Sequence, residues 1–250
     1  MRPSLRSAIL GRPRRPLVSG IPADLVPSDY AVHALGDSAY YQGPTGLITT
    51  PRTVRLVLYI TAIPSTSLRV IYMHESAAVH GVRVFTGNGG TTISALFGGS
   101  GGYAISPAYT ITSGDLGKLM VVHAWCDTVA HLAIGGAEVG SGSSAVTVTT
   151  PASTARPTVG RFQHGAGYGA DPGVRVLCVC QGDTAMTLPQ VAADAAAIMS
   201  RSRGLVYPSL PGEVLRYVAS DLVTSTDWHD RDGDDHTLVR TGTPTVARVP

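Results

Sequence analysis

Three aspartates alternate along positions 230–234, near the end of the 250-residue chain, and could ligate a metal ion. Asp230, Asp232 and Asp234 offer hard carboxylate oxygens, which suit Ca²⁺, an ion that takes about 6–8 oxygen ligands. His229 and His236 flank the run and would suit a transition metal instead. Gly233 is not at the position where an EF-type loop has its glycine, and the final glutamate of such a loop is missing. Both departures favour a solvated acidic turn over a calcium site. We therefore expect no cofactor, with calcium as the one exception that these aspartates allow.

Four aromatic residues stand beside glycine-rich or acidic turns, where they could stack on sugar rings. They are Tyr103, Tyr109, Tyr168 and Trp228. Their rings combine a large apolar face with a polar group that can form a hydrogen bond, which is the chemistry of lectin-like sites. The glycine-rich stretches at 87–90, 98–102 and 165–169 lack the motif G-x-x-x-x-G-K-[ST], so we do not expect them to bind phosphate. The four rings are the predicted ligand-binding residues.

Short β-strands are the elements that must position these side chains. The stretch Leu116–Val139 contains two β-rich runs separated by Asp127-Thr128, which predicts an antiparallel hairpin with Trp125 in the core. The run Arg52–Ala62 alternates and is rich in β-branched residues, so it predicts a further strand. Additional strands are expected at 30–35, 46–49, 68–74, 79–86, 92–97, 103–111, 145–150 and 174–180. Such regular spacing of short strands is typical of a sandwich or barrel.

A single segment, Leu188–Ser202, predicts a helix. Pro189 lies in its first turn, alanine dominates its composition, and one apolar stripe is formed by Val191, Ala195, Ile198 and Met199. We expect this short helix to cap one end of the sandwich.

The order of these elements resembles that of a known family. The hairpin is followed by Thr158-Val159-Gly160-Arg161, by a strand at Val174–Cys180, and by a helix introduced by Thr187-Leu188-Pro189. This order is similar to the C-terminal half of concanavalin A-like jelly rolls of the laminin-G or pentraxin type. The segment Trp228–Val246 resembles strings found beside jelly-roll domains in phage and secreted bacterial proteins. The resemblance implies an all-β, concanavalin A-like jelly-roll sandwich with one short helix, to which the composition of the first 27 residues adds an extended N-terminal arm.

Glycoside hydrolysis has to be considered, because some concanavalin A-like folds are glucanases. Retaining enzymes of this kind place two carboxylates about 5–5.5 Å apart, and the family carries them as Glu-x-Asp-x-x-Glu on one strand. The only glutamates here are Glu75, Glu138 and Glu213, and none lies in such a string. A G-x-S-x-G elbow is also missing, and the tyrosine, histidine and arginine within 161–168 are a weak basis for a polysaccharide lyase. We therefore predict that the protein is not an enzyme.

Composition excludes several other classes. The 19 basic and 17 acidic residues give a net charge of +2, which predicts no direct reading of nucleic acid. No segment approaches about 18 unbroken apolar residues, so we expect no membrane-spanning helix. Three cysteines are too few for a disulfide framework. Cys178 and Cys180 stand two apart on a predicted strand, so we expect core thiols that face one side and do not readily bridge.

The chain divides into three parts. The first 27 residues contain five Arg and five Pro without apolar periodicity, which predicts an extended basic arm. The jelly roll is expected over residues 28–203, followed by a linker and a C-terminal β-extension over 204–250.

The arm and the resemblance to phage proteins together predict a non-enzymatic structural or binding subunit of a virion, in the decoration, tail or fibre class. Such a protein is made in the host cytoplasm and resides in the virion. Its expected partners are other subunits, contacted through residues 1–27, and surface glycans. The alternatives are a free glycan-binding lectin and a carbohydrate-active enzyme.

Deletion of Met1–Pro22 tests the arm. A proline-rich segment is already extended and loses little entropy on docking, whereas a sandwich with its own core does not need the arm to fold. The truncated protein should keep its thermal melting transition and lose incorporation into the parent assembly, measured by sedimentation of assembled particles. Unchanged incorporation, or collapse of the truncated protein, would contradict this prediction.

Overall fold

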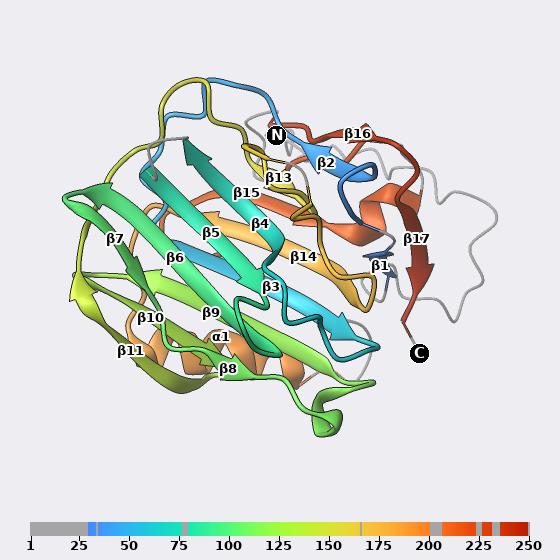
Figure 1. Ribbon diagram of the computed structural model, residues 1–250, viewed down its shortest axis with the longest axis horizontal. Helices are drawn as coiled ribbons and strands as arrows, with labels where there is room; N and C mark the ends of the chain where they lie inside the picture. The colour runs from blue at the N-terminus through green and yellow to red at the C-terminus, as the bar shows by residue number, and fades with distance from the viewer. Residues whose placement is uncertain are drawn as a thin grey trace, which may run out of the picture.

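The structure, a computed structural model, describes residues 30–33, 35–76, 80–165, 167–200, 207–223, 227–231 and 236–249. Two antiparallel sheets face each other across a shared apolar core (Figure 1). We call them the back sheet, whose outer surface carries the helix α1, and the front sheet. The predicted all-β sandwich with one short helix is confirmed.

The back sheet has the strand order β11-β10-β9-β3-β14-β1-β17, and β15 also pairs with β14. Its strands are β1 (Tyr30–His33), β3 (Thr53–Ile60), β9 (Leu119–Cys126), β10 (Val129–Ile134), β11 (Ala137–Ala145), β14 (Val174–Gly182), β15 (Glu213–Val218) and β17 (Thr245–Arg248). The predicted central hairpin is present as β9 and β10, and Trp125 is buried within it with 3% of its surface exposed.

The front sheet has the strand order β12-β6-β5-β4-β13-β2-β16, and β7 and β8 also pair with β6. Its strands are β2 (Tyr40–Gln42), β4 (Arg69–Ser76), β5 (His80–Thr86), β6 (Thr92–Ser100), β7 (Gly102–Ile105), β8 (Tyr109–Thr110), β12 (Thr147–Val148), β13 (Thr158–Val159) and β16 (Val239–Thr241). The strand predicted at 46–49 is wrong, because these residues form no regular structure and Gly46 has a φ of 90°, outside the strand region.

Strand β3 lies near the middle of the back sheet and is buried on both faces. Val54 and Leu56 join the core between the sheets, whereas Val57 and Tyr59 join a second apolar cluster on the opposite face. A strand covered on both faces is expected to be apolar throughout. Arg55, which is also completely buried, is the exception.

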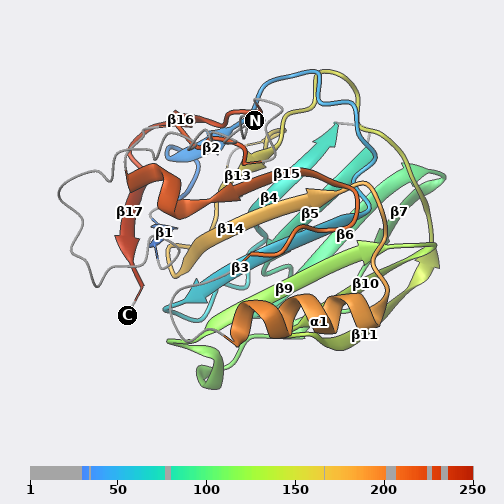
Figure 2. The same cartoon turned by 180° about the vertical axis from the view of Figure 1, so that it is seen from behind.

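Helix α1 (Leu188–Met199) lies across the outer face of the back sheet (Figure 2). Thr187 and Gln190 form a capping box at its first turn, and Pro189 fits there because the first N–H groups of a helix have no partner in the helix. Of the predicted stripe, Val191, Ala195 and Ile198 are buried against the sheet. Met199, at the last turn of the helix, is exposed, so its place in the stripe was predicted wrongly. The helix therefore covers a face of the sandwich, and the prediction that it caps one end is wrong.

The segment predicted as a linker and β-extension supplies strands to both sheets. β15 and β17 pair with β14 and β1 in the back sheet, whereas β16 pairs with β2 in the front sheet. The predicted arm, residues 1–27, lies outside the described residues. Across the described ranges, no helix has the length and apolar character to cross a membrane.

A small polar cluster lies in the core between the sheets. The Tyr72 hydroxyl donates to Oε1 of Gln181 at 2.8 Å, and Nδ1 of His74 lies 3.2 Å from the same oxygen. Because this oxygen only accepts, we assign the His74 proton to Nδ1. Burial lowers the pKa of His74 to about 4, in spite of the hydrogen bond from its ring to Gln181, and nearby His236 lowers it further.

The pH dependence of stability tests this cluster. His74 is neutral in the folded protein down to about pH 4, whereas an unfolded histidine takes up a proton near pH 6.5. The contribution of neutral His74 to the free energy of unfolding is therefore fully present above about pH 6.5. It is lost as the pH falls toward 4, and the loss amounts to about 3 kcal/mol in total. Urea unfolding from pH 7.5 to 4.5 should show a smaller loss for His74→Gln than for the unchanged protein. Equal losses in the two proteins would show that His74 is not buried neutral.

Candidate functional site

The outer face of the front sheet carries a row of residues that ends at Tyr103. The strand registers place Glu75, Gly81, Gly98 and Tyr103 directly opposite one another on β4, β5, β6 and β7. Their neighbours in sequence, such as Val82 and Phe97, belong to the core, so the row faces outward.

Two buried glycines form the middle of this row, between two large side chains. The two glycines leave it without side chains between Glu75 and Tyr103, over three strand spacings or about 14 Å. Tyr103 is 54% exposed. The row therefore ends in an exposed aromatic ring on β7 and in a buried carboxylate on β4.

A second row runs beside the first. It consists of Met73, Arg83, Leu96 and Ile105. Ile105 is 38% exposed next to Tyr103, whereas Leu96 and Met73 are buried in a small apolar cluster. The strip of the front sheet between β4 and β7 is thus apolar, with the charge of Arg83 at its centre.

Three rings from the segment between β13 and β14 pack over this face. Cζ of the Arg83 guanidinium lies 4.5 Å from the centroid of the Phe162 ring. The Phe162 and Tyr168 rings meet edge-to-face, with their centroids 5.3 Å apart. His164 meets Phe162 in the same way at 5.6 Å. The N–H of Val70 on β4 donates to the carbonyl of Tyr168 at 2.8 Å, which ties the segment to the sheet. Tyr168 keeps 39% of its surface exposed.

Arg83 is held in place by Glu75. Nε of Arg83 donates to Oε2 of Glu75 at 3.0 Å, and Nη2 donates to Oε1. This two-bond arrangement fixes the plane of the guanidinium and holds it against Phe162. Glu75 itself is 2% exposed. The polar centre of the face is therefore rigid.

Tyr109 does not join this face. Its partner on β6 is Ile93, a core residue, so the Tyr109 ring turns inward and packs against the core. Its hydroxyl donates to Oδ1 of Asp115 at 2.9 Å. Burial and the hydrogen bond to Asp115 raise the pKa of Tyr109.

The prediction for Trp228 is wrong, because the residue is completely buried. Its ring meets Tyr41 at 5.3 Å and Tyr217 at 5.9 Å, in the core between the sheets. A backbone bridge to Leu238 holds it there. A ring without exposed surface cannot stack on a sugar, so Trp228 is a core residue. Tyr103 and Tyr168 are the two predicted residues that the structure places, exposed, on the outer face of the front sheet.

Asp230, the first predicted metal ligand, has partners within the protein. Oδ1 accepts from the backbone N–H of Arg216 at 2.8 Å, and Oδ2 lies 3.1 Å from Nδ1 of His236. Asp232 and Asp234 lie outside the described residues. Among the residues that are described, no three His, Cys, Asp or Glu side chains converge as a metal site requires. Calcium stays a prediction that rests on the sequence alone.

The outer face of the back sheet contains a buried ionic network that the sequence analysis did not anticipate. Nη1 of Arg55 donates to Oδ1 of Asp194 at 2.6 Å and to the carbonyl of Pro208 at 2.8 Å. Oδ2 of the same carboxylate lies 2.7 Å from Nε2 of His123. Burial lowers the pKa of His123 in spite of this bond, so the ring is neutral. Burial acts against the charge on Arg55 as well, but nearby Cys180, Cys178 and Asp194 raise its pKa.

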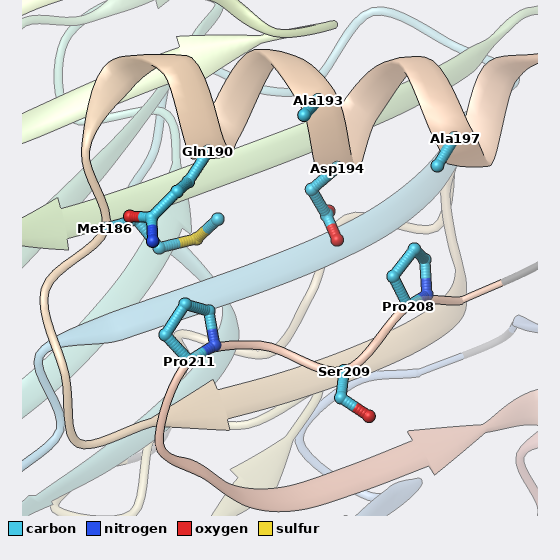
Figure 3. Close-up of a pocket in the computed structure, with 8 residues that line it drawn as sticks. All are labelled: Met186, Gln190, Ala193, Asp194, Ala197, Pro208, Ser209 and Pro211. Carbon is cyan, nitrogen blue, oxygen red and sulfur yellow. The ribbon is translucent and has the colours of Figure 1, made fainter.

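A pocket of about 310 Å³ lies between α1 and the segment 208–211 (Figure 3). It is lined by Met186, Gln190, Ala193, Asp194, Ala197, Pro208, Ser209 and Pro211. Figure 3 shows the Asp194 carboxylate pointing from α1 toward the sheet, where Arg55 and His123 already occupy both of its oxygens. The network therefore fastens α1 to the sheet, and we assign no ligand to this pocket.

The backbone is similar to those of solved structures. A protein from Bacteroides ovatus named as a candidate carbohydrate-binding protein superposes with a TM-score of 0.58 at 13% identity, over 88% of this chain and 60% of that one. A heptameric SAP-like pentraxin from Limulus polyphemus superposes with a TM-score of 0.56 at 15% identity, over 90% and 97%. The fold is a concanavalin A-like jelly roll.

The sequence itself matches no protein-family model and no curated protein. The jelly roll spans about 60% of the length of the Bacteroides protein. At these identities the likeness establishes the fold, which the sequence resemblance had predicted.

Removal of the carboxylate that pairs with Arg55 should strongly destabilise this jelly roll. Asp194→Ala leaves a buried guanidinium without its anion, which costs about 3–5 kcal/mol. Urea unfolding at pH 7 measures the loss. Asp183→Ala, an exposed aspartate in the segment before α1, is the control and should cost less than about 1 kcal/mol. Similar losses for the two variants would mean that the network does not fasten α1.

Proposed function

We propose that this chain is a non-enzymatic carbohydrate-binding subunit of a larger assembly, a virion protein of the decoration, tail or fibre class. The observation that carries the binding part is the outer face of the front sheet, where Tyr103 and Tyr168 are exposed on either side of the fixed Arg83 guanidinium. Sugar rings stack on aromatic faces through their C–H groups, and their hydroxyls need fixed polar partners. The face offers both.

The arrangement of the carboxylates supports a role without catalysis. Glu75 is paired with Arg83, Glu138 with His131 and Glu213 with Arg216, on three different strands. A glycosidase needs two carboxyl groups that face each other across one bond. The three glutamates instead contact three separate basic side chains.

The assembly part of the proposal rests on the sequence. Residues 1–27 are rich in arginine and proline, and arginine supplies planar donors for acidic grooves or backbone carbonyls on a neighbouring subunit. A free lectin is the alternative, and it would bind glycans without any requirement for the arm.

A glycan array probed with the purified protein tests binding and identifies the ligand class. Calorimetric titration with the best oligosaccharide should then show about tenfold weaker binding for Tyr103→Ala and for Tyr168→Ala, since one ring–sugar contact contributes about 1.4 kcal/mol. Ile48→Ala, at a residue 74% exposed outside the two sheets, is the control and should bind normally. Absence of binding on the array, or unchanged affinity in both tyrosine variants, would refute the glycan-binding role.

A further inference from the structure

Two thiols lie in contact beneath α1. Sγ of Cys178 and Sγ of Cys180 are 3.5 Å apart, and both residues are completely buried. They belong to the apolar cluster on the outer face of the back sheet, together with Met186 and Leu210. The third cysteine, Cys126, belongs to the core between the sheets and is therefore on the other side of the back sheet.

The backbone allows the two sulfur atoms to approach further. Residues two apart on a strand are separated by about 6.4–6.8 Å, which is the upper end of the Cα separation of about 4.4–6.8 Å that disulfides span. The register of β14 with β3 shifts just before the pair, between Val176 and Cys178, whereas Cys178, Val179 and Cys180 pair in register with both β3 and β15. A bulge bends and twists the strand that carries it. The observation that speaks for a bridge is the 3.5 Å approach of the two sulfur atoms on this strand.

A cation lies beside the pair. Nη2 of Arg55 donates to Sγ of Cys180 at 2.9 Å, and its Nη1 is held by Asp194 and Pro208. Burial opposes ionisation of both thiols, but the hydrogen bond from Cys180 and the charge of Arg55 lower the pKa of Cys178, while the pKa of Cys180 is raised. A guanidinium held beside two thiols in contact stabilises negative charge on the pair. One thiol can then lose its proton, while the other keeps its proton and donates it in a hydrogen bond to the thiolate.

We infer that Cys178 and Cys180 are a redox-active dithiol that a low-molecular-weight disulfide converts to an intramolecular disulfide. In the first step the Cys178 thiolate attacks one sulfur of the small disulfide, which forms a mixed disulfide and releases one small thiolate. In the second step Cys180 gives up its proton and attacks Sγ of Cys178, which closes the protein disulfide and releases the second small thiolate. The two protein thiols are oxidised and the small disulfide is reduced to two thiols.

The reaction is gated by the layer that covers the thiols. Because both side chains are completely buried, the oxidant reaches them only when α1 and the segment 207–211 open locally. Closure of the disulfide moves Sγ of Cys180, the acceptor of a hydrogen bond from Arg55, toward Cys178. The redox state of the pair is thus linked to the network that fastens α1.

Oxidised glutathione is the probe. The full-length folded protein is incubated with an excess at pH 8, quenched with acid, then denatured, alkylated with iodoacetamide and digested with trypsin. Both thiols fall in one tryptic peptide, residues 176–201, whereas Cys126 falls in another, residues 119–161, because trypsin does not cleave the Arg156–Pro157 bond. The expected result is a 176–201 peptide that carries no alkyl group and has lost two hydrogens, next to a fully alkylated 119–161 peptide. Phosphine reduction should restore alkylation at both thiols.

Cys180→Ser is the matched variant, because it removes only the resolving thiol. In this variant glutathione should stay attached at Cys178, whereas the unchanged protein should carry no adduct there. Alkylation of both thiols in the unchanged protein after prolonged incubation would overturn the inference. A stable glutathione adduct with Cys180 still free would overturn it as well.

Discussion

The arrangement of this jelly roll depends on one buried charge. Arg55 lies on β3, near the middle of the back sheet, with no exposed surface. A charge removed from water destabilises a protein by several kcal/mol unless a partner with good geometry compensates it. Asp194 on α1 is that partner, and the carbonyl of Pro208 adds a further acceptor. The helix and the segment before β15 are therefore required on this face, because the sheet cannot bury Arg55 without them.

This requirement makes the two outer faces of the sandwich different. On the back sheet, α1 covers part of the outer face (Figure 2), and beneath it Arg55, Asp194 and His123 bind one another. The front sheet leaves Tyr103, Ile105 and Tyr168 exposed around Arg83, whose charge is fixed by Glu75 and Phe162. Rigid, partly apolar surfaces with a few fixed polar groups are suited to ligand binding. The proposal that this chain binds glycans follows from that asymmetry.

The sequence predicted what is encoded locally. Alternation and turn residues located the β9–β10 hairpin, and the Thr187 cap with the apolar stripe located α1. The burial of single side chains, and ion pairs between residues far apart in the sequence, could not be predicted from local patterns. Arg55 and Asp194 are 139 residues apart, and nothing near either residue indicates the other. Trp228, in an acidic stretch, had the sequence context of a surface ring, yet the bridge to Leu238 buries it.

Amide chemical-shift mapping tests the binding face most directly. ¹⁵N-labelled protein would be titrated with the oligosaccharide that binds most strongly on the array, and the shifts would be assigned to residues. The account predicts that the largest changes fall on β5, β6 and β7 and on residues 160–170, while α1 and 207–211 stay unchanged. Largest changes at α1 and 207–211, with the front sheet unaffected, would contradict it.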